Sequence, residues 1–358
     1  ATWTVTTAAG DAHRAKHLVL GVGGLHHPKF PEVEGRERFA GPQLHSAKWD
    51  TSLDLAGKRV ALVGTGASAI QVLPEIAKGA KQVTVLQRTP AWVIARHDKP
   101  ISRAAKSLFR VFPALLWLNR ARIYAWLESR VGAFTRTPKL LRVAEWLGRR
   151  NLSHVRDEAT RRALTPTYAA GCKRVLLSDD YYPAFNRENV KLEVGGVKAV
   201  TANGVVTSDG RELACDVIAW CTGFEVAAPL AKLRVVGRGG RELARDAWKD
   251  GVHAYRGTTV PGFPNLFMLV GPNTGLGHNS MVYMIESQLE FVLQHLDLMD
   301  ASGARAVEPT EEATRAYNAM LQARFPGTIW ASGCASWYLD ETGHNRTLWP
   351  GATFSFRA

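Results

Sequence analysis

The sequence has 358 residues, of which 45 are Lys or Arg and 32 are Asp or Glu, giving a formal net charge of +13 at pH 7. Hydrophobic residues make up 46% and charged residues 22%, which is an ordinary globular composition. These values exclude a disordered tail, a collagen-like repeat and a small disulfide scaffold. The length suits two or three domains, each large enough to bury its own core.

Cysteine usage and hydropathy bear on the compartment in which the protein works. The four cysteines include no CxxC pair, so no zinc site or thioredoxin-like motif is predicted and no metal is expected. Four thiols fit a reducing compartment better than a disulfide framework. No signal peptide is visible, and no apolar run approaches the ~20 residues that span a bilayer. We therefore predict a cytoplasmic protein, with association at a membrane surface as the alternative.

Strands and a helix follow one another through the first hundred residues. A turn at Gly10-Asp11 is predicted to join the first two strands. The third strand is a continuous apolar run, typical of a parallel strand buried on both faces, and with the helix and strand after it makes a βαβ unit. The predicted strands span 3–7, 17–22, 58–63 and 82–87, and the helix spans 68–78.

Between 101 and 163 the apolar spacing predicts several short helices, interrupted at Pro113, Gly132, Pro138 and Gly148. Residues 99–165 contain fifteen Lys or Arg and four Asp or Glu, a net +11 of the total +13. We interpret this charge as the solvated faces of a helical insert. Attraction of an anionic cofactor is one alternative, and contact with a membrane surface, favoured by Trp117, Tyr124 and Trp126, is another. No nucleic-acid partner is predicted, because zinc-finger and RNP-type signatures are lacking.

The last part of the chain returns to strands. The pair Asn203-Gly204 predicts a hairpin turn between two of them. A long helix is predicted over 279–299, after an apolar strand and a glycine-rich loop. The predicted strands span 190–194, 196–201, 205–207, 216–220 and 266–270.

A glycine pattern between the third strand and its helix indicates dinucleotide binding. In Gly64-x-Gly66-x-Ser68-Ala69 the first glycine permits the tight turn and the second leaves room for a pyrophosphate at the helix N-terminus. The alternative is a plain tight turn between strand and helix. At the end of the next strand Arg88 and Thr89 stand where an NAD site places an acidic residue, so NADPH is favoured over NADH. Here the alternative is an ordinary exposed arginine.

A second motif lies between these glycines and the N-terminus. Phe39, Gly41, His45, Trp49 and Asp50 fit the pattern F-x-G-x-x-x-H-x-x-x-W-[P/D]. On the residues alone, His45 could be a satisfied core histidine and Trp49 a packing residue. The pattern, followed closely by the glycine motif, resembles the fingerprint of the Baeyer–Villiger monooxygenases, a branch of the flavin-containing monooxygenases.

Other segments support this resemblance, which covers nearly the whole chain. Residues 216–224 resemble the D-x-x-x-x-A-T-G-[F/Y] strand that leads back toward the FAD domain, with Cys221 in place of alanine. Residues 171–190 resemble the K-R…YY…N-R-x-N-V region. Residues 271–273 resemble the segment that approaches the flavin, and residues 336–351 resemble the C-terminal part.

The resemblance implies a mechanism and roles for single residues. NADPH would reduce FAD, and a flavin peroxide would insert one oxygen of O2 beside the carbonyl of a hydrophobic ketone. Arg174 is the candidate catalytic residue, a permanent cation that can stabilise an oxyanion; the alternative is a surface arginine. The fingerprint would couple the motions of the two dinucleotide domains. The implied cofactor contacts are Lys173 with Arg88 and Thr89 on the 2′-phosphate, Thr222, Gly223 and Asn273 toward the flavin, and Trp337 on the nicotinamide nucleotide.

The predicted fold is α/β, with two Rossmann-like dinucleotide-binding domains and a helical insert at 100–165. Residues 1–50 would be the latter part of the first FAD segment and the linker, 51–220 the NADPH domain, and 221–358 the returning FAD segment. No G-x-G-x-x-G opens a helix within residues 1–50, so we expect the FAD domain to be incomplete at its N-terminus. Two alternatives remain open. One is an N- or S-oxygenating flavin monooxygenase, and the other is an inactive NADPH-binding remnant without stable FAD.

Overall fold

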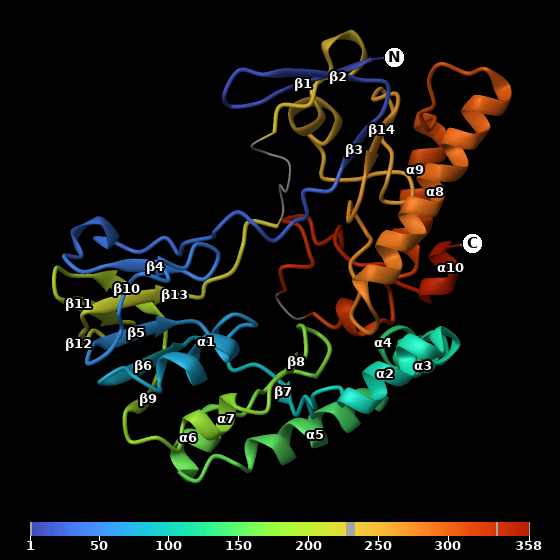
Figure 1. The fold of residues 1–358 in the computed structure, drawn as a ribbon. Helices are drawn as coiled ribbons and strands as arrows, with labels where there is room; N and C mark the ends of the chain where they lie inside the picture. Colours follow the sequence, from blue (N-terminus) through green and yellow to red (C-terminus); the bar gives the residue numbers. More distant parts are fainter. Residues whose placement is uncertain (1, 227–232, 334–335, 358) are drawn as a thin grey trace. The chain divides into compact units, whose positions relative to one another are not determined.

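The structure is a computed structural model that describes residues 2–226, 233–333 and 336–357 (Figure 1). The chain divides into two compact units. Unit 1 contains residues 1–24, 101–139 and 226–358, and unit 2 contains residues 25–100 and 140–225. The segment predicted as one helical insert, 100–165, is therefore divided, because its first part belongs to unit 1 and its last part to unit 2.

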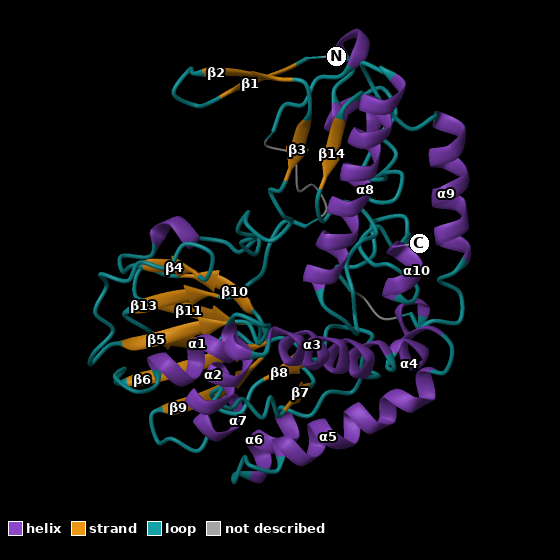
Figure 2. Ribbon diagram, turned by 45° about the vertical axis from the view of Figure 1, so that its right-hand side comes forward, coloured by secondary structure: helices purple, strands orange, loops and turns teal. Residues whose placement is uncertain are grey.

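Unit 2 is built on a five-stranded parallel sheet (Figure 2). The strand order is β4-β13-β5-β6-β9, and each neighbouring pair is parallel. Helix α1, Ala69–Ile76, connects β5 to β6, which confirms the predicted βαβ unit. The strands span Gln43–His45 (β4), Arg59–Val63 (β5), Gln82–Gln87 (β6), Val190–Val194 (β9) and Val217–Trp220 (β13).

The central strands of this sheet are buried on both faces. On one face Val60 and Leu62 of β5 pack with α1 and with the short helix α7, Tyr181–Ala184. On the other face Ala61 and Val63 pack with residues of a small antiparallel sheet. Side chains alternate between the faces of a strand, so a strand covered on both sides needs an apolar residue at every position. This explains the continuous apolar run of β5.

The small antiparallel sheet, of order β10-β11-β12, follows β9 in the chain. Its first turn lies at Asn203-Gly204 as predicted, and the N–H of Thr201 donates a hydrogen bond to the carbonyl of Gly204. The remaining elements of unit 2 are β10 (Val197–Val200), β11 (Gly204–Thr207), β12 (Glu212–Ala214), the parallel pair β7 (Val93–Ile94) and β8 (Leu176–Leu177), α5 (Arg142–Leu152) and α6 (Glu158–Ala163).

Unit 1 contains two pairs of strands. Strands β1 (Trp3–Thr6) and β2 (Ala12–Ala15) form an antiparallel hairpin around the predicted Gly10-Asp11 turn. The prediction that this turn leads into the strand at 17–22 is wrong, because the polar, exposed segment β2 supplies the partner instead. Strand β3 (Leu18–Leu20) pairs in parallel with β14 (Leu266–Met268).

Helices make up most of the remainder of unit 1. Helix α8 spans Met281–Ser302, close to the predicted helix at 279–299. Helix α3, from the predicted insert, packs on α8, and the rings of Tyr124 and Tyr283 stack with centroids 4.7 Å apart. Helix α9 is absent from the sequence prediction. The other helices are α2 (Arg103–Val111), α3 (Pro113–Glu128), α4 (Val131–Thr135), α9 (Glu311–Ala323) and α10 (Thr353–Arg357).

The cysteines differ from the expectation of four thiols. Cys215 and Cys221 are buried free thiols, and burial raises the pKa of each to about 12. Cys172 is disulfide-bonded, which corrects the prediction at that position, and Cys334 lies outside the described residues. Within the described ranges, every helix is too short or too polar to span a bilayer.

Candidate functional site

The turn between β5 and α1 contains the glycines of the predicted dinucleotide motif. Gly64 has a φ of 111°, and a Cβ placed there would lie less than 3.0 Å from the carbonyl oxygen of Cys221. Only glycine fits this close approach to the segment after β13. At Gly66, by contrast, no described atom lies within 4 Å of an added Cβ. A ligand can therefore come close to the backbone at Gly66, just before the N-terminus of α1, where the helix dipole favours an anion.

Ser68 and Ala69 complete this motif. Ser68 directly precedes α1, and its carbonyl accepts hydrogen bonds from the backbone N–H groups of Gln71 and Val72. Ala69 is fully buried in the core between α1 and the sheet. A small residue at this third position lets the helix pack closely on the strand, as dinucleotide sites require.

Arg88 and Thr89 follow the carboxyl end of β6, directly beside this turn. The Thr65 hydroxyl donates a 2.8 Å hydrogen bond to the carbonyl of Thr89, which fixes the two loops to each other. Gln87 turns inward, and its Nε2 donates to the carbonyl of Ala163 at 2.7 Å. Arg88 is exposed. The group presented to a ligand here is therefore a cation, as an adenosine 2′-phosphate requires.

Lys173 and Arg174 lie on a loop that is anchored to the segment after Arg88. The indole N–H of Trp92 donates to the carbonyl of Tyr168 at 2.8 Å, and the N–H of Leu176 donates to the carbonyl of Trp92. The Lys173 ammonium lies 5.0 Å from the centroid of the Tyr168 ring. Lys173 is half-buried and Arg174 is exposed. Both candidate cations thus belong to the unit that carries the β5–α1 turn.

The fingerprint residues lie in and around β4, an edge strand of the same sheet. Phe39 is buried against the face that packs on the antiparallel sheet. A Cβ at Gly41 would lie less than 3.0 Å from the carbonyl oxygen of Asp216, so a larger residue would push β4 away from β13. His45 ends β4 opposite Trp220 of β13 and is 4% exposed. Its Nδ1 accepts a 3.1 Å hydrogen bond from the N–H of Ala47.

His45 packs against a two-stranded ribbon at the boundary of unit 2, which we call the boundary ribbon, residues 27–30 and 222–225. Its ring lies 5.0 Å from that of Phe30 and 6.0 Å from that of Phe224, both edge to face. The carbonyls of Lys29 and Gly223 face the imidazole, but burial is the larger effect and lowers the pKa of His45. His45 is therefore held as a neutral ring that joins the sheet to the boundary ribbon.

Thr222 and Gly223 belong to the boundary ribbon itself. The Thr222 hydroxyl donates a 2.6 Å hydrogen bond to the carbonyl of Lys29. The N–H of Lys29 donates to the carbonyl of Gly223, and the N–H of Glu225 donates to the carbonyl of His27, each at 3.0 Å. In this structure the Thr222 hydroxyl is thus used to bind the two strands of the boundary ribbon together.

Trp49 and Asp50 both make contacts within the protein itself. Trp49 is partly buried against the core between α1 and the sheet. The Asp50 carboxylate accepts hydrogen bonds from the N–H of Ser52 at 2.9 Å and from its hydroxyl at 2.6 Å, and these bonds lower the pKa of Asp50. The pair therefore shapes the chain between β4 and β5.

In unit 1, Asn273 lies in a loop that is bonded to the C-terminal segment. The residue has a φ of 57° and is 1% exposed. Its Nδ2 donates to the carbonyls of Asn345 at 2.8 Å and Leu348 at 2.9 Å. Both amide hydrogens of Asn273 are therefore bonded within the protein, which leaves the backbone groups of this loop to contact a flavin. Trp337 is 49% exposed, and its ring centroid lies 4.5 Å from that of Tyr338.

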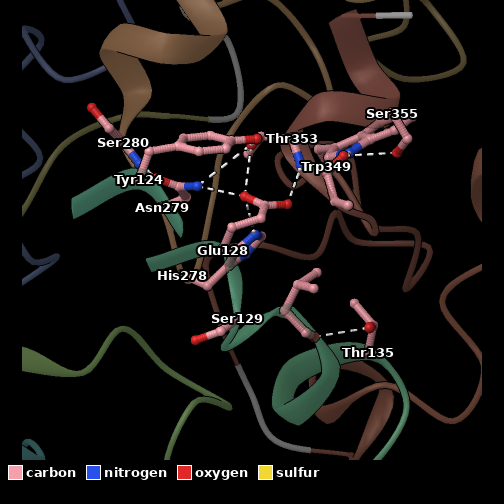
Figure 3. Close-up of polar contacts among 12 residues, drawn as sticks. Tyr124, Glu128, Ser129, Thr135, His278, Asn279, Ser280, Trp349, Thr353 and Ser355 are labelled. Atoms are coloured by element: carbon pink, nitrogen blue, oxygen red, sulfur yellow. Dashed lines mark hydrogen bonds and ion pairs between the residues drawn. The ribbon is translucent and has the colours of Figure 1, made fainter. Parts of the chain in front are cut away.

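A buried carboxylate in unit 1 is missing from the sequence prediction (Figure 3). Glu128, at the end of α3, is 8% exposed and accepts hydrogen bonds from Thr353 and Asn279. The Nε2 atom of His278 lies 3.7 Å from Glu128 Oε2, yet burial lowers the pKa of His278. One feature of the sequence could have drawn attention to Glu128: it is the only acidic residue between 99 and 144. We assign His278 no catalytic role.

The residues present fit two dinucleotides by their chemistry. In unit 2 the open backbone at Gly66 suits a pyrophosphate, and the exposed Arg88 suits a 2′-phosphate. In unit 1 the parallel strands β3 and β14 place their carboxyl ends at one edge, which is where α/β sheets bind nucleotides. There the Oδ1 atom of Asn273 is buried without a partner among the described residues.

Comparisons with known proteins agree with this chemistry. The flavin-binding monooxygenase-like family model matches residues 2–239. The chain is 45% identical to Baeyer–Villiger monooxygenases of Pseudomonas aeruginosa and Streptomyces coelicolor, covering 99% of this chain and 68% and 69% of theirs. A cyclohexanone monooxygenase from Rhodococcus sp. Phi1 bound to NADP+ matches with a TM-score of 0.86 at 26% identity, covering 99% of this chain and 74% of that one. OTEMO in complex with FAD and NADP matches with a TM-score of 0.85 at 26% identity, over 99% and 75%.

The family model, the sequence relatives and the solved structures all point to one class of enzyme. The resemblance inferred from the fingerprint and the predicted fold class with two dinucleotide-binding domains are confirmed. The chain belongs to the flavin-binding monooxygenase-like family and, within it, to the Baeyer–Villiger monooxygenases.

Proposed function

We propose that the protein uses NADPH and FAD to insert one oxygen atom of O2 beside the carbonyl of a hydrophobic ketone. The observation that carries this proposal is the fingerprint from Phe39 to Asp50, with His45 packed against the boundary ribbon, in a chain 45% identical to Baeyer–Villiger monooxygenases. The ketone class is supported by the similarity to a cyclohexanone monooxygenase. We further propose that unit 2 is the NADPH domain and that unit 1 belongs to the FAD domain.

Bound FAD and NADPH would supply the oxygen and hydride chemistry, and the chain's own residues would bind and orient. The backbone at Gly66 and the N-terminus of α1 would hold the pyrophosphate of NADPH. Arg88, Thr89 and Lys173 would bind its 2′-phosphate. Arg174 would stabilise negative charge that develops on the substrate oxygen, because a guanidinium keeps its charge where a lysine or histidine can lose it.

The visible spectrum of the purified chain and the analysis of its products test this proposal. We expect a bound-flavin spectrum that bleaches on addition of NADPH, and an ester or lactone as the product of a cyclic ketone such as cyclohexanone. A colourless protein that still binds NADPH would favour the alternative of an inactive remnant. Exclusive sulfoxidation, when a thioether is offered beside the ketone, would favour an N- or S-oxygenating monooxygenase.

Peripheral membrane contact through the basic helices is a separate proposal. Trp117 of α3 is 71% exposed and Trp126 is 63% exposed, and the Arg130 guanidinium lies 3.6 Å from the centroid of the Trp126 ring. Aromatic side chains beside cations suit an anionic lipid surface. Co-sedimentation with anionic but not with neutral phospholipid vesicles is the expected result. Equal recovery in the supernatant with both would contradict it.

A further inference from the structure

Helices α3 and α8 of unit 1 meet along a polar seam of three contacts. Arg120 forms an ion pair with Glu286, Tyr124 stacks on Tyr283, and Glu128 binds Asn279 at the end of the seam. The α3 residues are four apart, so they share one face of the helix, and their partners run in the opposite order. The side chain of Arg120 is 58% exposed, whereas Glu128 is 8% exposed. The seam therefore passes from solvent into the interior.

Glu128 gathers donors from two distant segments of unit 1, as Figure 3 shows. Its Oε1 accepts a 2.7 Å hydrogen bond from the backbone N–H of Thr353. Its Oε2 accepts from the Thr353 hydroxyl at 2.7 Å and from Asn279 Nδ2 at 2.5 Å. All three partners donate, so both oxygens of the Glu128 side chain act as acceptors. A glutamine would turn its own NH2 toward one of these donors.

These bonds act on the glycine-rich loop before α8, at one end directly and at the other through the C-terminal segment. The Asn279 side chain accepts a 2.7 Å hydrogen bond from the N–H of Ser280, and the Ser280 hydroxyl caps α8 by accepting from the N–H of Val282 at 3.2 Å. At the other end, the N–H of Trp349, four residues before Thr353, donates to the carbonyl of Gly275 at 2.8 Å. The Glu128 carboxylate thus ties α3 directly to Asn279 at one flank of residues 275–280, and through Thr353 to the segment 349–353 that bonds the other flank.

We propose that Glu128 is a positioning residue: its carboxylate fixes residues 275–280 in the conformation in which their backbone meets the flavin, without touching the cofactor itself. This inference rests on the proposed function, because it takes the loop as part of the FAD site. His278 is buried beside Glu128, and burial disfavours a charged imidazole. The anchor of the loop is therefore the Glu128 carboxylate and not His278.

The experiment compares Glu128→Gln with a rescue variant and a control on the same seam. In Glu128→Gln/Asn279→Asp the introduced NH2 faces a carboxylate acceptor at position 279 and can also donate to the Thr353 hydroxyl, and the net charge is restored. Arg120→Gln alters only the exposed end of the seam. Two readouts are taken: hydrogen–deuterium exchange of residues 271–280 in the flavin-free protein, and the Kd for FAD of that protein.

Glu128→Gln is expected to speed exchange of this loop and to weaken FAD binding about tenfold, because one buried donor is left opposed by another. The double variant is expected to restore both values to within about twofold, and Arg120→Gln to leave both unchanged. If Glu128→Gln fails to fold, Thr353→Val removes a single donor and is expected to show the same two changes to a smaller extent.

The outcomes separate this inference from the function on which it rests. Unchanged exchange in Glu128→Gln, or no rescue in the double variant, would overturn the positioning role. Faster exchange with unchanged FAD affinity would overturn the assignment of the loop to the flavin site, while leaving the monooxygenase function to stand. Absence of FAD binding by the unaltered chain would instead defeat the proposed function.

Discussion

The two units hold their candidate cofactor elements in place by different interactions. In unit 2 the turn after β5 is set by backbone contacts, with Gly64 against Cys221, while Gly66 and Arg88, the residues proposed to meet NADPH, are exposed. In unit 1 the loop before α8 is held by buried side chains, Asn273 and Glu128. Binding and stability are therefore expected to be separable by mutation in unit 2, but to change together in unit 1.

The largest expected effect tests this separation within one turn. Gly64→Ala is expected to destabilise the protein by about 3 kcal/mol, because its Cβ would collide with backbone at a positive φ. Gly66→Ala is expected to cost less than about 0.5 kcal/mol and yet to weaken NADPH binding by about tenfold or more, because its Cβ would enter open space that the proposed pyrophosphate site requires. Thermal unfolding and NADPH titration measure both. Equal losses of stability in the two variants would contradict the distinction.

Asn273 offers the matching test in unit 1. Asn273→Ala is expected to destabilise the protein by about 2 kcal/mol, because the buried carbonyls of Asn345 and Leu348 each lose a donor. FAD retention, measured from the visible spectrum, is expected to fall in parallel with the unfolding temperature. Loss of FAD at unchanged stability would show that the side chain meets the flavin directly and is not a structural anchor.

The exposed cations of unit 2 are expected to act on affinity alone. Arg88→Ala is expected to weaken NADPH binding about tenfold and to leave NADH binding and the unfolding temperature unchanged, because the guanidinium would meet only the 2′-phosphate. Lys173→Ala is expected to have a smaller effect, since this ammonium already contacts the Tyr168 ring. An unchanged NADPH/NADH preference in Arg88→Ala would remove Arg88 from the 2′-phosphate site.

The smallest expected effect concerns an ion pair at the start of two neighbouring strands. Arg59 of β5 lies 2.7 Å from Asp216, which precedes β13, and its hydrogen bonds lower the pKa of Asp216 from 3.8 to about 2. A lowered carboxyl pKa stabilises the fold above pH 3.8, and this contribution is lost as the pH falls toward about 2. Asp216→Asn is therefore expected to cost about 1 kcal/mol or less near neutral pH, as both side chains are partly exposed. Unfolding measured against pH should show the two proteins converging in acid; a constant difference would exclude the ion pair as its cause.

The parts of the fold that the sequence predicts well are those with a strong local signal. The β5–α1–β6 unit is recognisable because an apolar run, a glycine turn and a second apolar run follow within thirty residues. Strand β4 has three residues, and its partner β13 comes much later in the chain, so no local pattern indicates it. Strand β2 is polar and fully exposed, and it therefore lacks the alternation that marks a half-buried strand.

The candidate sites show the same limit. Gly64, Gly66 and Arg88 can be named from the sequence because the turn that joins them is local. The contacts of Glu128 cannot, because Asn279 lies 151 residues away and Thr353 lies 225 residues away. A carboxylate inside a basic helix suggests a solvated ion pair until its partners are seen. For Asn273 the sequence and the structure differ. The resemblance places this residue toward the flavin, whereas the structure shows its amide nitrogen bound to backbone carbonyls.

The boundary ribbon has a mechanical consequence. A single peptide strand can swivel at every φ and ψ, whereas two strands joined by hydrogen bonds must bend together. Residues 27–29 and 222–225 carry two backbone hydrogen bonds and the bond from the Thr222 hydroxyl to the Lys29 carbonyl. Sliding one strand past the other would break all three, while flexing across the flat of the ribbon would break none. The His45 ring packs against Phe30 and Phe224. We therefore expect the ribbon to resist sliding of one strand past the other and to bend about a single axis.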